Sequence, residues 1–183
     1  MKRRELLKNT SLWISGMLIV PPSSVMLSSC DITEKESSWK SVFFSKKSAD
    51  LLYEIIDTLI PNTEIPGAIA ANVHKFIESY VQDVYDTDKR KWFVEELSDF
   101  DQKIKKFSGQ SIFDLKLEDR INTLNQIQIE EGNNSFYVNL KRFVITGYFN
   151  SEIGVKQALN YRPIPGTFKG CIPLEESEGK SWS

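Results

Sequence analysis

Apolar side chains recur every three or four residues through most of this chain, and this spacing most restricts what it can fold into. In the first such segment Leu51, Leu52, Ile55, Ile56 and Leu59 fall on one face of a helix. An α-helix turns once in about 3.6 residues, so this spacing makes one apolar stripe. The pattern predicts amphipathic helices that pack against one another. The later segments with this pattern are 70–85, 88–107, 117–131 and 135–149.

The later stripes are assigned to a common core, because aromatic residues at helical spacing belong to a core more often than to a cofactor site. They comprise Val73, Phe76, Ile77, Tyr80, Val81 and Val84; Trp92, Phe93, Leu97, Phe100, Ile104 and Phe107; Leu117, Ile121, Leu124 and Gln128 or Ile127; and Phe136, Leu140, Phe143, Val144 and Tyr148.

Capping and turn residues mark where these helices begin and end. Ser45 or Ser48 can cap the first helix, and Pro61 ends it. Gly109 is placed to stop the third helix, and residues 132–134 close the fourth. These signals separate the segments into individual helices.

The C-terminal part is less regular. A short sixth helix is predicted over 151–160, and residues 161–183 contain several prolines and glycines that oppose regular structure. No segment alternates convincingly enough for a β-sheet. The prediction is a small all-α domain of five to six helices with an irregular C-terminal arm that contains Pro and Gly.

The N-terminal sequence predicts an export signal. Arg3 and Arg4 precede a weakly apolar stretch and resemble a twin-arginine signal, which sends folded proteins across a bacterial inner membrane. Leu27-Ser28-Ser29-Cys30 resembles a lipobox, in which the Cys30 thiol is acylated and the chain is cut before it. The apolar stretch is too short and polar to span a bilayer, which takes about 20 apolar residues. The alternative is an ordinary amphipathic N-terminal helix.

Three regions follow from this signal: a signal peptide over 1–29, a lipidated cysteine and polar tether over 30–44, and a helical domain over 45–183. Removing residues 1–29 leaves 154 residues with 19 basic and 24 acidic side chains, a net charge of −5. This length suits one domain. The acidic balance argues against binding to nucleic acid, for which a basic patch is expected.

Catalytic motifs are missing from the sequence: it contains no dinucleotide fingerprint, P-loop, nucleophile elbow or zinc motif. His74, the one histidine, is assigned to a surface or packing role. The three pairs of adjacent glutamates are assigned to solvated faces, because adjacent helical residues point in different directions. No catalytic, cofactor-binding or metal-binding residue is therefore predicted. The pairs are Glu95-Glu96, Glu130-Glu131 and Glu175-Glu176.

If Cys30 carries lipid, Cys171 has no internal partner, so neither an intramolecular disulfide nor a zinc cluster is available to it. Three alternatives stay open for Cys171: it is buried as a small apolar side chain, it pairs with another chain, or it is reactive.

Two sets of residues carry a family resemblance. The first is LIPNTEIPGA at 59–68, followed by Val73 and Phe76-Ile77; the second is GYFNSEIG at 147–154, ALNYRPIPG at 158–166 and Gly170-Cys171. Together they resemble the gluconate 2-dehydrogenase subunit 3 family over roughly 45–174. The lipobox departs from the pattern, because many such small subunits lack one.

The resemblance implies the small, non-catalytic subunit of a membrane-associated periplasmic dehydrogenase. In that family the large subunit is similar to glucose-methanol-choline oxidoreductases, carries FAD and oxidises a sugar or sugar acid. The expected partners are this flavoprotein, a cytochrome c subunit as an optional electron acceptor, and the membrane through the lipid on Cys30. The chain itself is expected to bind no cofactor and to assist folding and twin-arginine export of the flavoprotein.

The C-terminal arm supplies the candidate partner interface, because aromatic and proline side chains offer rigid contact area at low entropic cost. The alternative is that these residues cover their own helical core, and Cys171 is a candidate for an intersubunit disulfide. The candidate residues are Tyr148, Tyr161, Pro163, Pro165, Phe168 and Cys171.

Two other functions remain open on the sequence alone. One is a lipoprotein subunit that itself takes part in the oxidation, which would require bound FAD or haem. A haem held by His74 and a methionine is disfavoured, because Met1, Met17 and Met26 all lie in the signal. The other is a structural or scaffold lipoprotein with no redox partner.

Overall fold

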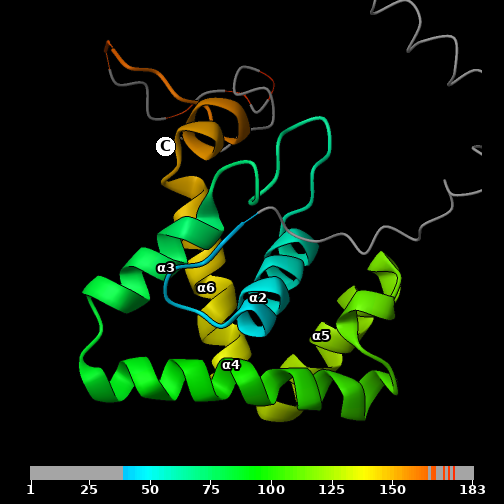
Figure 1. Ribbon diagram of the computed structural model, residues 1–183. Helices are drawn as coiled ribbons and strands as arrows, with labels where there is room; N and C mark the ends of the chain where they lie inside the picture. Colours follow the sequence, from blue (N-terminus) through cyan, green and yellow to red (C-terminus); the bar gives the residue numbers. More distant parts are fainter. Residues whose placement is uncertain (1–38, 165, 168–170, 172, 174, 176–183) are drawn as a thin grey trace, which may run out of the picture. The chain divides into compact units, whose positions relative to one another are not determined.

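The computed structural model of the chain describes residues 39–164, 166, 167, 171, 173 and 175 (Figure 1). These residues belong to one compact unit. No β-strand occurs within these ranges, which confirms the prediction of an all-α domain. The helices are α2 (Lys46–Leu59), α3 (Val73–Asp83), α4 (Thr87–Ser108), the 3-10 helix η1 (Ile112–Asp114), α5 (Leu117–Glu131), α6 (Phe136–Phe149) and the π-helix η2 (Gly154–Ala158).

Most helix ends lie where the capping residues predict them. The Ser45 hydroxyl caps α2 by accepting a hydrogen bond from the Ser48 backbone N–H, so Ser48 lies inside the helix. Ser135 caps α6 in the same way through the N–H of Val138. Gly109 ends α4 with φ of 73°, a left-handed conformation that glycine adopts without a steric penalty.

Helix α3 is shorter than predicted, covering 73–83 in place of 70–85. Residues 68–72 form a separate turn, in which the N–H of Asn72 donates to the carbonyl of Ile69. Asn72 then adopts a left-handed conformation with φ of 57°, which asparagine tolerates better than most residues. This reversal ends the turn before α3 begins at Val73.

The predicted sixth helix over 151–160 is largely the π-helix η2. A Cβ atom at Gly154 would lie 1.9 Å from the carbonyl oxygen of Tyr148, so only glycine allows the chain to pass so close to the end of α6. The Ser151 hydroxyl donates to that same carbonyl and accepts from the N–H of Gly154, at 2.6 and 3.0 Å. The turn after α6 is therefore closed by short polar contacts.

Helix α2 lies at the centre of the domain and contacts α3, α4, α5 and α6 (Figure 1). Its Leu52, Ile55 and Ile56 side chains are completely buried. Burying one such side chain contributes about 1.5 to 3 kcal/mol, so this helix organises much of the core. Buried residues of the surrounding helices, such as Leu97 and Leu140, complete the same cluster.

Buried charges on α2 and α4 are paired. Glu54 of α2 forms an ion pair with Arg120 of α5, whose Nε also donates to the Leu115 carbonyl at 2.9 Å. Asp101 of α4 forms ion pairs with Lys47 and with Lys105 of its own helix, each at 3.0 Å. Pairing offsets the cost of removing these carboxylates from water.

The packed part of the chain begins earlier than the predicted domain boundary at residue 45. Glu78 of α3 accepts hydrogen bonds from the N–H groups of Val42 and Phe43, each at 2.8 Å, and from the hydroxyl of Ser41. The Trp39 ring packs against His74 at 4.9 Å between centroids. Residues 39–44, predicted as part of a polar tether, are therefore held against α3.

Several predicted core residues are partly exposed. Phe76, Trp92 and Ile121 keep 39%, 41% and 40% of their surface exposed. Their helices bury the neighbouring face through residues such as Ile77 and Phe93. The assignment of these complete stripes to the core is therefore wrong, because each stripe is wider than the face its helix buries. The exposed members also include Val84, Leu117 and, in part, Tyr80 and Phe143.

Candidate functional site

Two sequence runs that lie far apart in the chain meet at the end of α6. The Tyr148 hydroxyl donates a hydrogen bond of 2.9 Å to the carbonyl of Pro66 in the loop between α2 and α3. Tyr148 itself is only 4% exposed. This contact joins the loop 59–68 to the run 147–154, two of the segments that carry the family resemblance.

The loop between α2 and α3 is closed internally as well. The Asn62 side-chain oxygen accepts from the N–H of Gly67 at 2.6 Å, and the N–H of Ala68 donates to the Ile60 carbonyl at 2.9 Å. A Cβ atom at Gly67 would lie 2.4 Å from that Ile60 oxygen, which leaves no room for a larger residue. The motif residues thus build a tight joint between two segments.

The sequence predicts Tyr148 as a candidate partner contact, with coverage of its own core as the alternative. The structure supports the alternative for this residue, because its ring is buried and its hydroxyl is engaged by Pro66. Burial also raises the pKa of Tyr148, so the hydroxyl remains a hydrogen-bond donor.

The other candidate residues are either exposed or outside the described residues. Tyr161 is 43% exposed, and Pro163 is also exposed. Cys171 is exposed and is not part of a disulfide among the described residues. Pro165 and Phe168 in the C-terminal arm, like Arg3, Arg4 and Cys30 at the N-terminus, lie outside the part of the chain that the structure describes.

His74 is buried and belongs to the core, where it contacts the rings of Trp39 and Tyr53. Its Nδ1 atom has no hydrogen-bond partner within the described ranges. Burial and the adjacent Lys75 lower the pKa of His74 to about 4, against a smaller opposing effect of Glu78. The imidazole is therefore neutral near pH 7.

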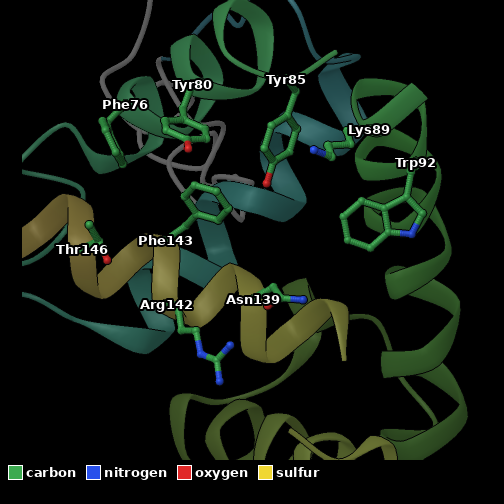
Figure 2. Close-up of a pocket in the computed structure, with 9 residues that line it drawn as sticks. All are labelled: Phe76, Tyr80, Tyr85, Lys89, Trp92, Asn139, Arg142, Phe143 and Thr146. Carbon is green, nitrogen blue, oxygen red and sulfur yellow. The ribbon is translucent and has the colours of Figure 1, made fainter. Parts of the chain in front are cut away.

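A groove of about 620 Å³ opens where α3, α4 and α6 meet (Figure 2). Figure 2 shows the rings of Tyr80, Tyr85 and Phe143 gathered at its centre, while α4 and α6 supply the two walls. Its complete lining is Phe76, Tyr80, Tyr85, Lys89, Trp92, Asn139, Arg142, Phe143 and Thr146.

The central rings hold one another in place. Tyr80 lies edge-on to Phe143 at 4.9 Å and to Tyr85 at 5.6 Å between ring centroids. Such edge-to-face pairs contribute roughly 0.5 to 1.5 kcal/mol beyond area burial. Beneath Phe76, a Cβ atom at Gly147 would lie 2.7 Å from the ring, so glycine allows α3 and α6 to approach closely.

Part of this groove lies on the predicted core stripes. The stripes include Phe76, Tyr80, Trp92 and Phe143, whereas no sequence pattern marks the polar lining residues, such as Arg142. The available signal was the width of the stripe in α3, where more apolar residues occur than one buried face needs.

No group of His, Cys, Asp and Glu side chains in the described region is arranged to hold a metal ion. The helices of that same region include none with the length and apolar character needed to cross a bilayer. One glutamate of each of the pairs 95–96 and 130–131 belongs to an ion-pair network, in which Lys103 contacts Glu131 at 2.8 Å and Glu96 at 3.6 Å.

The Tyr148 contact makes a testable prediction. We expect Tyr148→Phe to lower the free energy of unfolding by about 1 to 2 kcal/mol, because it leaves the Pro66 carbonyl without this donor. Urea unfolding followed by circular dichroism measures the change. Tyr161→Phe is the control, since that side chain is exposed; equal stability of the two variants would contradict the proposed joint.

The lowered pKa of His74 predicts that the stability of the domain depends on pH. Its folded-state pKa of about 4 lies below the unfolded value of about 6.5, so the unfolded chain binds the proton more readily. Neutral His74 therefore contributes up to about 3 kcal/mol to the free energy of unfolding. This contribution is present above pH 6.5 and is lost as the pH falls towards 4. Urea unfolding at several pH values should show a weaker dependence in His74→Phe. An imidazole that titrates near 6.5 by NMR would contradict this.

Comparisons with known proteins give one match. Residues 46–166 match the family described as gluconate 2-dehydrogenase subunit 3, which is more than half of the chain. No curated protein and no solved structure matches the chain. The matched range covers every described α-helix and both halves of the joint at Tyr148. The chain belongs to the gluconate 2-dehydrogenase subunit 3 family, a family of accessory subunits of dehydrogenase complexes.

Proposed function

We propose that this chain is the non-catalytic small subunit of a periplasmic sugar or sugar-acid dehydrogenase. A separate flavoprotein subunit, of the glucose-methanol-choline type, binds FAD and carries out the oxidation. The observation that carries the proposal is the family match over 46–166, which spans the whole helical domain. The chain itself binds no cofactor and acts by associating with the flavoprotein.

The contacts made by residues of the family-like segments support a role in binding another subunit. Tyr148, Gly67 and Gly154 all serve internal contacts that shape the end of α6 and the neighbouring loop. These contacts hold the surface at this end of the domain in one form, which suits the association of subunits. The exposed aromatic residues Phe76 and Trp92 supply contact area of the kind that is enriched at interfaces.

The N-terminal sequence supports two further roles. Arg3 and Arg4 direct the chain, together with its folded flavoprotein, to the twin-arginine route. After cleavage the lipid on Cys30 holds the complex on the periplasmic side of a bacterial membrane. Several acyl chains on one lipoprotein give firm attachment, whereas a single chain binds only marginally. A cytochrome c subunit fits this arrangement as an electron acceptor.

Purification of the tagged full chain from bacterial membranes tests the assembly. We expect a flavoprotein to co-purify and its FAD absorbance to follow the large subunit when the two are separated. FAD or haem absorbance that stays with this chain would instead indicate that it takes part in the oxidation. Recovery of the chain without any flavoprotein would favour a scaffold lipoprotein.

Conversion of Arg3-Arg4 to Lys-Lys tests the export role. The change keeps the positive charge but removes the arginine pair, so we expect the flavoprotein to remain in the cytoplasm. Immunoblots of cytoplasmic, periplasmic and membrane fractions measure its location. A flavoprotein that still reaches the periplasm would overturn this role.

Cys30→Ser is the matched control for that experiment, because it preserves the arginine pair and removes only the acylated thiol. We expect the flavoprotein to be exported with this variant but to move from the membrane fraction to the soluble periplasmic fraction. Comparison of the two variants therefore distinguishes export of the flavoprotein from its attachment to the membrane.

A further inference from the structure

The groove between α3, α4 and α6 presents aromatic surface that the domain does not use to bury its own core. Trp92 remains 41% exposed on one side of the groove and Phe76 39% exposed on the other. Large, partly exposed aromatic side chains that surround a concavity are typical of binding hot spots, where tryptophan and tyrosine are enriched. This surface is therefore available to an apolar group from outside the domain.

The aromatic side chains of the groove are held in place before any ligand binds. Tyr80 is held edge-on by Phe143 and Tyr85, and Trp92 packs against the buried ring of Phe136 at 5.9 Å. Side chains held by their neighbours lose little rotamer freedom when a ligand binds, so more of the contact energy remains as affinity. Burial, with a contribution from Tyr80, raises the pKa of Tyr85, so this phenol is neutral near pH 7.

The charged side chains of the lining are all cationic. Lys89 lies on the α4 wall beside the rings, and Arg142 belongs to the α6 wall with its guanidinium pointing away from the rings; the lining includes no carboxylate (Figure 2). Lys89 contacts Asp86 at 3.7 Å, but both side chains are well exposed, and such pairs contribute only about 0 to 1 kcal/mol. The lining of the groove is thus positive, although the predicted mature chain is net acidic.

Together these features define the occupant. We propose that the groove binds an acidic peptide segment of the flavoprotein subunit, with an aromatic or aliphatic side chain that inserts between Trp92 and Phe143. Carboxylates of that segment pair with Lys89 and Arg142, while Asn139 and Thr146 offer hydrogen bonds to its backbone. This inference rests on the proposed function and places its subunit contact at one site.

Charge reversal tests the site. The full chain carrying Lys89→Glu and Arg142→Glu, co-expressed with the flavoprotein, should bind it at least about tenfold more weakly than the wild type, because like charges would then face each other. Affinity of the purified complex, measured by titration at low and high salt, gives the change. The wild-type affinity should also fall as salt increases. Equal binding by the wild type and the double variant would overturn the inference.

Lys106→Glu together with Lys116→Glu is the matched control, because these two exposed lysines do not line the groove and the net charge changes by the same amount. It should bind the flavoprotein as the wild type does, and an equal loss in this control would overturn the assignment to the groove. Trp92→Ala removes the aromatic wall without changing charge and should weaken binding with less effect on its salt dependence. Circular dichroism confirms that each variant is folded.

The acidic residues near the C-terminus of this chain offer a competing occupant. If Glu175, Glu176 and Glu178 filled the groove, replacing all three with glutamine would strengthen binding of the flavoprotein, which would overturn the proposal. We expect no change in affinity. A wild-type chain that recovers no flavoprotein would overturn the proposed function as well, which distinguishes that failure from a failure of the groove alone.

Discussion

The burial of α2 by the other four described α-helices is the constraint on which the rest of this domain depends. Leu52, Ile55 and Ile56 are completely buried, and the same helix carries Glu54, whose charge is paired by Arg120 of α5. Apolar contact supplies most of the stabilisation, while the ion pair ties α5 to a specific position. Once α2 is enclosed, the remaining faces of α3, α4 and α6 are left to form the outer surface.

The family motifs acquire a physical explanation at the end of α6. Tyr148 and Pro66 lie far apart in the chain, yet one hydrogen bond joins them, and Gly67 and Gly154 leave room for the backbone segments that pack there. Each glycine is required because a Cβ atom would collide with a carbonyl oxygen. The signature of this family therefore marks a structural joint in this chain, and it specifies the shape of one end of the domain.

The same helices that build the core also form the aromatic groove. Ile77 and Phe93 face inward, while Phe76 and Trp92, their neighbours in sequence, border the groove. A helix whose apolar stripe is wider than its buried face has surface left for another contact. The charge of the lining favours an acidic partner, because Lys89 and Arg142 are cationic whereas the predicted mature chain is net acidic.

The sequence by itself determined the helical class and most helix boundaries, because periodicity and capping act over a few residues. Ser45 and Gly109 are examples in which the local signal and the structure agree. Only the tertiary structure decided which side of each stripe is buried, since that depends on neighbours distant in sequence. Tyr148 is therefore internal and Trp92 partly exposed, although both stood on predicted apolar stripes. The groove follows from the same long-range packing, which no single segment specifies.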